Sequence, residues 1–144
     1  MGSVFDIAVS GLRAQSRRLA VSADNVANVS SLGVHPDPQL AKPEGFAPQR
    51  TVFRSLAQGG AQGGAQGGAG GGVVASTAPI APASFLSFQP DHPDADPDGM
   101  VPLPNVSLEQ EMVEQIQALR LFQANLATIR TQDRMLGALL DIVS

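Results

Sequence analysis

The last part of the chain, residues 107–144, constrains the fold most because its apolar residues recur with a helical period. Counted in heptads, its inward positions are Met112, Gln115, Leu119, Phe122, Leu126, Ile129, Asp133, Leu136, Leu140 and Val143, and eight of the ten are large and apolar. This spacing is typical of an α-helix that packs along one side. Ser107 and Gln110 have the spacing of an N-terminal capping box. We predict a single helix of roughly 55 Å.

The start of the chain repeats this pattern in a weaker form. Large apolar residues stand at every seventh position in Phe5, Leu12, Leu19 and Val26. Polar residues become frequent after them, and Gly33 and Pro36 are helix-ending residues. We therefore predict a first helix over residues 3–30. Together, the two apolar stripes give the residues on which helix packing and assembly are expected to rest: Phe5, Leu12, Leu19, Val26, Met112, Leu119, Phe122, Leu126, Ile129, Leu136, Leu140 and Val143.

The middle of the chain differs from both ends in composition. All 11 prolines and 12 of the 15 glycines lie between Gly33 and Asn105. Runs of β-branched and aromatic residues predict short strands at 49–56, 73–76 and 85–88. Between the first two, Gln-Gly-Gly-Ala occurs three times, which predicts a flexible linker over 57–72. Residues 89–105, rich in Pro and Asp, are expected to cross the surface in an extended form.

These patterns predict a mainly α fold. Its N- and C-terminal helices would pair as a coiled-coil-like hairpin, with a loop-rich middle containing a few short β-strands. The corresponding division is an N-terminal helix at 1–31, a middle segment at 32–106 and a C-terminal helix at 107–144. The C-terminal helix also carries a second apolar line: Val113, Leu121, Ala124, Met135, Leu139 and Ile142. Apolar residues on two faces require more than one neighbour, so we expect another protein molecule to complete the core.

The bulk properties exclude several classes of function. The net charge of −4 offers no electrostatic reason for nucleic-acid binding. The absence of cysteine removes disulfides, thiolate metal sites and cysteine nucleophiles. No apolar run approaches the ~18 residues of a membrane span. Asp6 and Arg13 interrupt any apolar stretch at the N-terminus, so we expect no cleaved signal peptide.

One acidic segment invites a metal or catalytic interpretation. Asp94, Asp96 and Asp98 followed by Gly99 begin like a calcium-binding loop, but Asn105 stands where the bidentate Glu is needed. His92 among these carboxylates, and His35 beside Asp37, could serve as a catalytic base with its orienting carboxylate, and His92 with Asp94 could belong to a metal-dependent hydrolase. No nucleophile accompanies them, and a solvated turn is the simpler interpretation. The sequence predicts no catalytic, metal-binding or cofactor-binding residue, and no cofactor.

Asp133 is the polar residue that interrupts the apolar stripe of the C-terminal helix. Two interpretations stay open. A local shift of the heptad would turn Asp133 toward solvent. Alternatively, it would set the register by contacting Arg or Asn on a neighbouring molecule.

Three blocks of sequence together resemble the bacterial flagellar rod and hook family. The first runs Val-Ser-Gly-Leu-Arg-Ala-Gln from Val9, followed by Ala-Asp-Asn-Val-Ala-Asn from Ala23. The second, His-Pro-Asp-Ala-Asp from His92 with Pro-Asn-Val from Pro104, is similar to the short protein of the proximal rod. The third is Arg-Leu-Phe-Gln-Ala-Asn from Arg120. The residues carrying this resemblance are Gly11, Leu12, Asn25, Asn28, His92, Pro93, Asp94, Asp96, Pro104, Asn105, Gln123 and Asn125.

The resemblance implies a structural subunit without enzymatic activity. Members of this family leave the cell through the flagellar type III export apparatus, uncleaved, and polymerise through their terminal helices into the periplasmic rod that transmits motor torque. The implied partners are other rod and basal-body proteins, copies of the same chain and the export apparatus, with no nucleic acid and no membrane span. The alternative is a cytoplasmic helical-hairpin adaptor that binds a partner helix in the export system.

Overall fold

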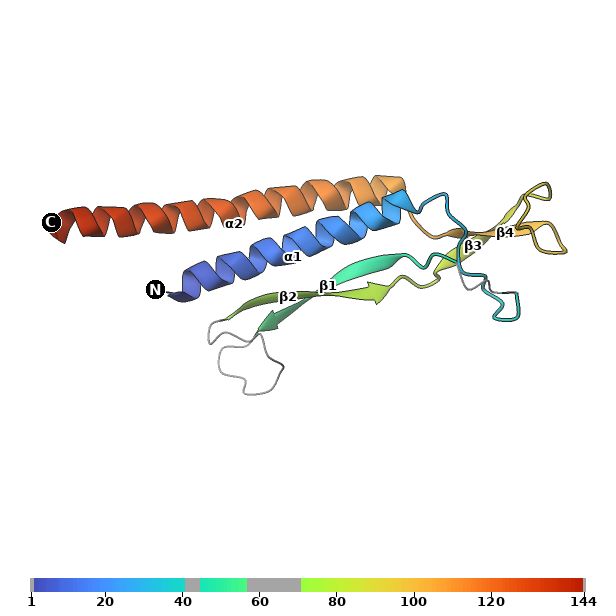
Figure 1. The fold of residues 1–144 in the computed structure, drawn as a ribbon, viewed down its shortest axis with the longest axis horizontal. Coiled ribbons are helices and arrows are strands. Elements are labelled where there is room, and N and C mark those ends of the chain that lie inside the picture. The colour runs from blue at the N-terminus through green and yellow to red at the C-terminus, as the bar shows by residue number, and fades with distance from the viewer. Residues whose placement is uncertain (1, 41–44, 57–70, 144) are drawn as a thin grey trace.

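The structure is a computed structural model that describes residues 2–40, 45–56 and 71–143. In chain order its elements are α1 (Gly2–Ala27), β1 (Gln49–Leu56), β2 (Gly72–Pro79), β3 (Ser84–Phe88), β4 (Met100–Pro104) and α2 (Leu108–Val143). The molecule is elongated, with both helices along its length and the β3–β4 hairpin at one end (Figure 1). The predicted linker at 57–72 lies outside the described residues except for its last two positions.

The helix α2 begins directly after Ser107, which caps it. The N–H of Gln110 donates to Ser107 Oγ at 3.4 Å, and Ser107 Oγ donates to Glu109 Oε2 at 2.8 Å. The pKa of Glu109 is lowered by its own backbone N–H first and then by the Ser107 hydroxyl. The negative charge is thereby held at the positive end of the helix dipole.

The two helices lie side by side and run antiparallel (Figure 1). A Cβ added at Gly11 would lie 2.7 Å from Asn125 Oδ1, so the helices approach closely there. Nearer the other end, Asn25 Nδ2 donates to Glu111 Oε1 at 2.7 Å. These two pairs fix the alignment, in which Gly2 lies opposite about residue 134 of α2, since each helix advances ~1.5 Å per residue.

The seam between the helices lies one position before the large apolar residues of the sequence pattern. It contains the small or polar residues Gly11, Arg18, Asn25, Glu111, Ala118 and Asn125, all buried or half-buried. The apolar residues that follow each of them stand beside the seam, and Leu19, Met112 and Leu119 are exposed. Both columns repeat every seven residues, so periodicity alone does not distinguish them. Within one chain, α1 and α2 therefore contact each other mainly through small and polar side chains.

The β1–β2 hairpin covers the other side of α1 and is fixed at both ends. Asn25 pairs with the backbone of Gln49 at the start of β1: its Nδ2 donates to the Gln49 carbonyl at 2.7 Å, and its Oδ1 accepts the Gln49 N–H at 3.1 Å. Near the start of β2, the N–H of Val73 donates to Ser10 Oγ at 3.1 Å. The strands pair antiparallel from Gln49 opposite Pro79 to Leu56 opposite Gly72.

The β3–β4 hairpin packs against the segment that follows α1. The N–H of Gly33 donates to the Pro102 carbonyl at 2.8 Å. A Cβ at Gly33 would lie 2.9 Å from the carbonyl carbon of Leu103, so only glycine fits this approach. Val101, Pro48 and Pro104 are among the largest fully buried side chains of the described residues. A small second core therefore joins this hairpin to the rest of the molecule.

The predicted mainly α fold class is wrong. Besides two helices of 26 and 36 residues, the described chain forms four strands in two small antiparallel sheets. The middle is therefore a sheet-rich region and the fold is α+β. Strand β1 has the bounds expected from its composition, whereas β2 extends to Pro79, beyond the predicted strand. The scarcity of aromatics misled the prediction, because each hairpin gains support from α1 or from the segment that follows it.

Strand β4 was predicted as an extended surface segment because it contains two prolines. Pro102 and Pro104 stand at alternate positions, and neighbouring residues of a strand direct their N–H groups to opposite sides. The Pro102 carbonyl accepts from Gly33, so the missing N–H of this residue faces the segment after α1 and not β3. The prolines therefore leave the β3–β4 ladder intact.

Within the described residues, neither helix has the length and apolar character needed to cross a membrane.

Candidate functional site

The candidate functional site is the helix pair, which presents a polar side toward β1 and an apolar side away from it. On the polar side, the Arg18 guanidinium pairs with the Glu114 carboxylate and donates to Gln117 Oε1 at 2.9 Å. The same guanidinium lies 5.9 Å from the ring centre of Phe53 in β1. Arg18 thus joins α1, α2 and β1 through one charged group, an arrangement that favours a single relative position of the three elements.

A buried network continues this polar side. Asn25 and Ser22 are 2% and 3% exposed, and both contact Glu111 at the start of α2. Ser22 Oγ donates to the Glu111 carbonyl at 3.2 Å, while Asn25 links the Glu111 carboxylate to Gln49. Buried polar groups are costly unless partnered. This network therefore specifies the register of the helix pair more strongly than apolar contacts would.

The apolar side is a groove between α1 and α2 of about 420 Å³. Its wall on α1 contains Leu19, Ala20 and Ala23, and its wall on α2 contains Ala118, Leu119 and Phe122. Three of these six residues are alanines, which leave space between the helices. The groove has the composition of a hole that takes a large apolar side chain.

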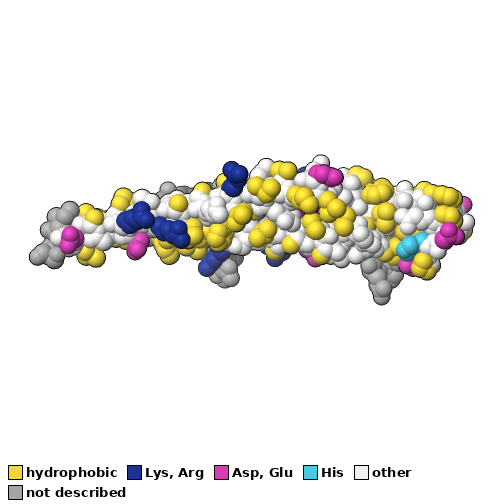
Figure 2. All heavy atoms as spheres, turned by 90° about the horizontal axis from the view of Figure 1, so that it is seen from above, with side chains coloured by type: hydrophobic (Ala, Val, Ile, Leu, Met, Phe, Trp, Pro, Cys, Tyr) yellow, Lys and Arg dark blue, Asp and Glu magenta, His cyan; other side chains and the backbone are white. Residues whose placement is uncertain are grey.

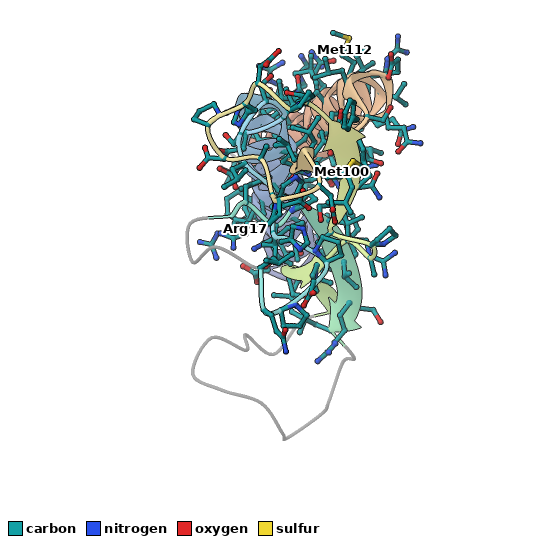
Figure 3. The ribbon with its side chains drawn as sticks, turned by 90° about the vertical axis from the view of Figure 1, so that its right-hand side faces the viewer. Arg17, Met100 and Met112 are labelled. Atoms are coloured by element: carbon teal, nitrogen blue, oxygen red, sulfur yellow. The ribbon has the colours of Figure 1, made fainter. Side chains whose placement is uncertain are left out.

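The predicted packing residues fall into two groups in the structure. Leu12, Val26, Phe122, Leu126 and Ile129 are half-buried. The others whose side chains are described are exposed: Phe5, Leu19, Met112, Leu119, Leu136 and Leu140. Met112 projects away from the helix pair (Figure 3), and Leu140 is 73% exposed. The side chain of Val143 lies outside the described part. The role of this set in assembly stays a prediction.

Asp133 is exposed in α2. This position agrees with a heptad shifted by one residue, in which the neighbouring Gln132, half-buried, belongs to the seam. Contact of Asp133 with another molecule stays a prediction.

The acidic segment with His92 connects β3 to β4, and the buried His35 approaches it from the segment after α1. His35 Nε2 lies 3.6 Å from Asp96 Oδ2, an electrostatic contact too long for a hydrogen bond. Asp96 Oδ1 accepts the N–H groups of Met100 and Asp98 at 2.8 and 2.9 Å. The Met100 N–H is the main cause of the lowered pKa of Asp96, with the Asp98 N–H and His35 contributing further. Asp96 therefore organises the turn and ties it to the segment after α1.

The sequence analysis associated His92 with the aspartates around it and His35 with Asp37. His92 does lie near Asp94, with Nδ1 4.0 Å from Asp94 Oδ2. His35 contacts the distant Asp96, a pairing that no local spacing could indicate. Among the described residues, no three His, Cys, Asp or Glu side chains are grouped in a way that could hold a metal ion.

The remaining motif residues hold chain junctions or lie on the surface. Asn28 Nδ2 donates to the Asp24 carbonyl at 2.9 Å at the end of α1. Asn105 Nδ2 donates to the Pro82 carbonyl at 3.0 Å, which fastens the end of β4 to the start of β3. Pro93 and Gln123 are exposed.

Sequence reasoning missed the polar seam. Arg18, Asn25 and Glu111 carry much of it, yet the sequence analysis selected the apolar residues beside them. The available signal was a second seven-residue repeat, formed by Gly11, Arg18 and Asn25 on α1. A repeat of small and polar residues beside an apolar one indicates a close-packed seam next to an unfilled face.

An elongated antiparallel pair of terminal helices, joined by a polar seam and flanked by two small β-hairpins, defines the class of the fold. Flagellar basal-body rod protein FlgC of Yersinia enterocolitica is 39% identical over 129 residues, which cover 90% of this chain and 87% of the relative. The protein of the same name from Salmonella typhimurium is 38% identical over 134 residues, covering 93% and 91%. The chain belongs to the flagellar basal-body rod protein family.

A more distant relative and two family models agree with this assignment. The FlgC protein of Borreliella burgdorferi is 33% identical over 154 aligned residues, covering 98% of this chain and 96% of the relative. Residues 5–33 match the family described as flagella basal body rod protein. Residues 98–142 match the C-terminal family of the flagellar basal body rod FlgEFG proteins. These two matches fall mainly on α1 and on β4 with α2.

Proposed function

We propose that this protein is a structural subunit of the flagellar basal-body rod that polymerises through α1 and α2. The observation that carries the proposal is the exposed apolar surface of both helices in a chain similar to rod proteins over most of its length. Figure 2 shows hydrophobic side chains distributed along the molecule on the face seen there. Exposed apolar surface on this scale is typical of a protein–protein interface.

The proposed partners follow from the same surface. Neighbouring copies and other basal-body proteins would cover the apolar columns beside the seam. The rigid polar seam would keep each helix pair intact while torque passes through the rod. The protein would reach the periplasm through the flagellar export apparatus. Its role would be mechanical, without catalysis.

The proposal is tested by placing a charge on the exposed apolar column. Leu119 is 53% exposed, so Leu119→Asp should leave the isolated fold intact while burying an unpaired carboxylate in the assembled rod. A buried unpaired charge costs several kcal/mol. We expect loss of motility and absence of the variant from purified basal bodies.

Thr131→Asp is the matched control, since it adds the same charge at an exposed polar position of the same helix. It should retain motility. Normal motility of the Leu119→Asp strain, or a wild-type chain found only in the cytoplasm, would contradict the proposed function.

A further inference from the structure

The helix α2 is longer than α1, so its C-terminal end extends past the start of α1. Since Gly2 lies opposite about residue 134, residues 135–143 project beyond the start of α1 (Figure 1). We call these residues the overhang. At ~1.5 Å per residue it is about 13 Å long.

The overhang is apolar and open to contact. Met135, Leu136, Leu139 and Leu140 are between 38% and 73% exposed. Met135 and Leu139 stand four residues apart, as do Leu136 and Leu140, so each pair lies on one side of the helix. A Cβ added at Gly137 would meet nothing within 4 Å. Exposed apolar side chains gathered at one end of a helix are typical of a surface that another protein covers.

The apolar groove of the helix pair matches the overhang in length and chemistry. Along α1 it extends from Gln15 to Ala23, about 12 Å at ~1.5 Å per residue. Its alanines provide holes where the overhang provides leucines and a methionine as knobs. The groove lies well inside the helix pair, so the overhang of the same rigid α2 cannot fold back into it.

We propose that the overhang of one copy occupies the apolar groove between α1 and α2 of a second copy. This inference rests on the proposed function and names the contact between copies. A groove and a complementary projection at different places on one molecule form a heterologous contact, which generates rings or open helical arrays. Each added copy would then present a new free groove or a new free overhang to the next.

Cysteine pairs test this contact directly, because the chain contains no cysteine of its own. Leu119→Cys places a cysteine in the groove, and Leu140→Cys places one on the overhang. The two positions are 21 residues apart on α2, which is a distance of about 32 Å. A disulfide requires Cα atoms within about 7 Å, so the double variant cannot form this bond within one chain. Leu19→Cys with Leu139→Cys is a second pair of the same design.

Basal bodies purified from cells producing each double variant are oxidised and separated without reductant. We expect disulfide-linked dimers at least ~10-fold more abundant than in the control Val74→Cys/Leu140→Cys, which keeps the overhang cysteine and moves the other to exposed β2. Basal bodies that contain a groove–overhang variant without dimers would overturn the inference. Absence of the wild-type chain from basal bodies would instead overturn the proposed function.

Discussion

At the scale of single residues, a few short contacts determine how the elements fit together. Gly11 allows Asn125 to lie against α1, and Asn125 Nδ2 donates to the Leu121 carbonyl at 2.9 Å. Gly33 allows β4 to approach the segment after α1. Gly33 is required by space, since a Cβ there would lie 2.9 Å from a backbone atom of Leu103, whereas a Cβ at Gly11 would displace the end of the Asn125 side chain.

Gly11→Ala should destabilise the helix pair, because the new Cβ forces Asn125 out of its place. We expect a net loss of up to about 1 kcal/mol in the free energy of unfolding, measured by urea denaturation, because displacing Asn125 costs more than the ~1 kcal/mol that alanine gains over glycine in a helix. Gly11→Ala combined with Asn125→Ala should recover most of that loss, since the obstructing side chain is gone. Strict additivity of the two single substitutions would contradict a direct contact.

Asp96 gives the β3–β4 tip a dependence on pH. Its pKa is lowered in the folded chain, chiefly by the Met100 N–H. A lowered pKa means that the stabilisation is fully present above the ordinary value of 3.8 and is lost as pH falls through the folded value. The amide resonance of Met100 should therefore titrate with a midpoint below 3.8. Asp96→Asn should remove this transition, and a midpoint above 3.8 in the unaltered chain would contradict the assignment.

At the scale of elements, α1 is the centre of the molecule because it is packed by α2 on one side and by the β1–β2 hairpin on the other. Asn25 serves both contacts at once. Local periodicity was sufficient to locate both helices, because it depends on residues close in sequence. Locating the seam required knowing which of two adjacent columns, each repeating every seven residues, forms the contact between the helices. The column with the larger apolar side chains was predicted, but it stays largely exposed.

The hairpins show the same limit of prediction from local sequence. Strand β1 was predictable from its run of Thr, Val and Phe, whereas β4 needed knowledge of a distant donor, Gly33. The contact of His35 with Asp96 likewise joins segments far apart in the chain. Such long-range contacts are determined by the whole fold, so they cannot be predicted from the spacing of residues close in sequence.

Asn25→Ala should loosen the β1–β2 hairpin from α1. The substitution leaves the Gln49 backbone groups and the buried Glu111 carboxylate without their partner, at a cost of about 2–3 kcal/mol. Hydrogen exchange of the β1 amides should accelerate accordingly. Asp24→Ala, an exposed neighbour on the same helix, is the control. Unchanged exchange of the β1 amides in Asn25→Ala would show that the hydrogen bonds between Asn25 and Gln49 do not hold β1 against α1.

At the scale of the whole molecule, the chain combines a small internal core with a large exposed apolar surface. Among the described residues, the buried apolar side chains of the helices are alanines. The leucines of both helices are exposed or half-buried. Burial contributes about 25 cal/mol per Å² of apolar surface. In the proposed rod, much of the available stabilisation would therefore be realised only when neighbouring subunits cover the helices.

The most direct test of this account is amide hydrogen exchange of α2 in the isolated chain and in purified basal bodies. The account predicts fast exchange over residues 135–143 in the isolated chain and at least ~100-fold slower exchange in the rod, because exchange reports local opening. Exchange over residues 135–143 that is equally slow in both states, or equally fast in both, would contradict the claim that assembly completes this molecule.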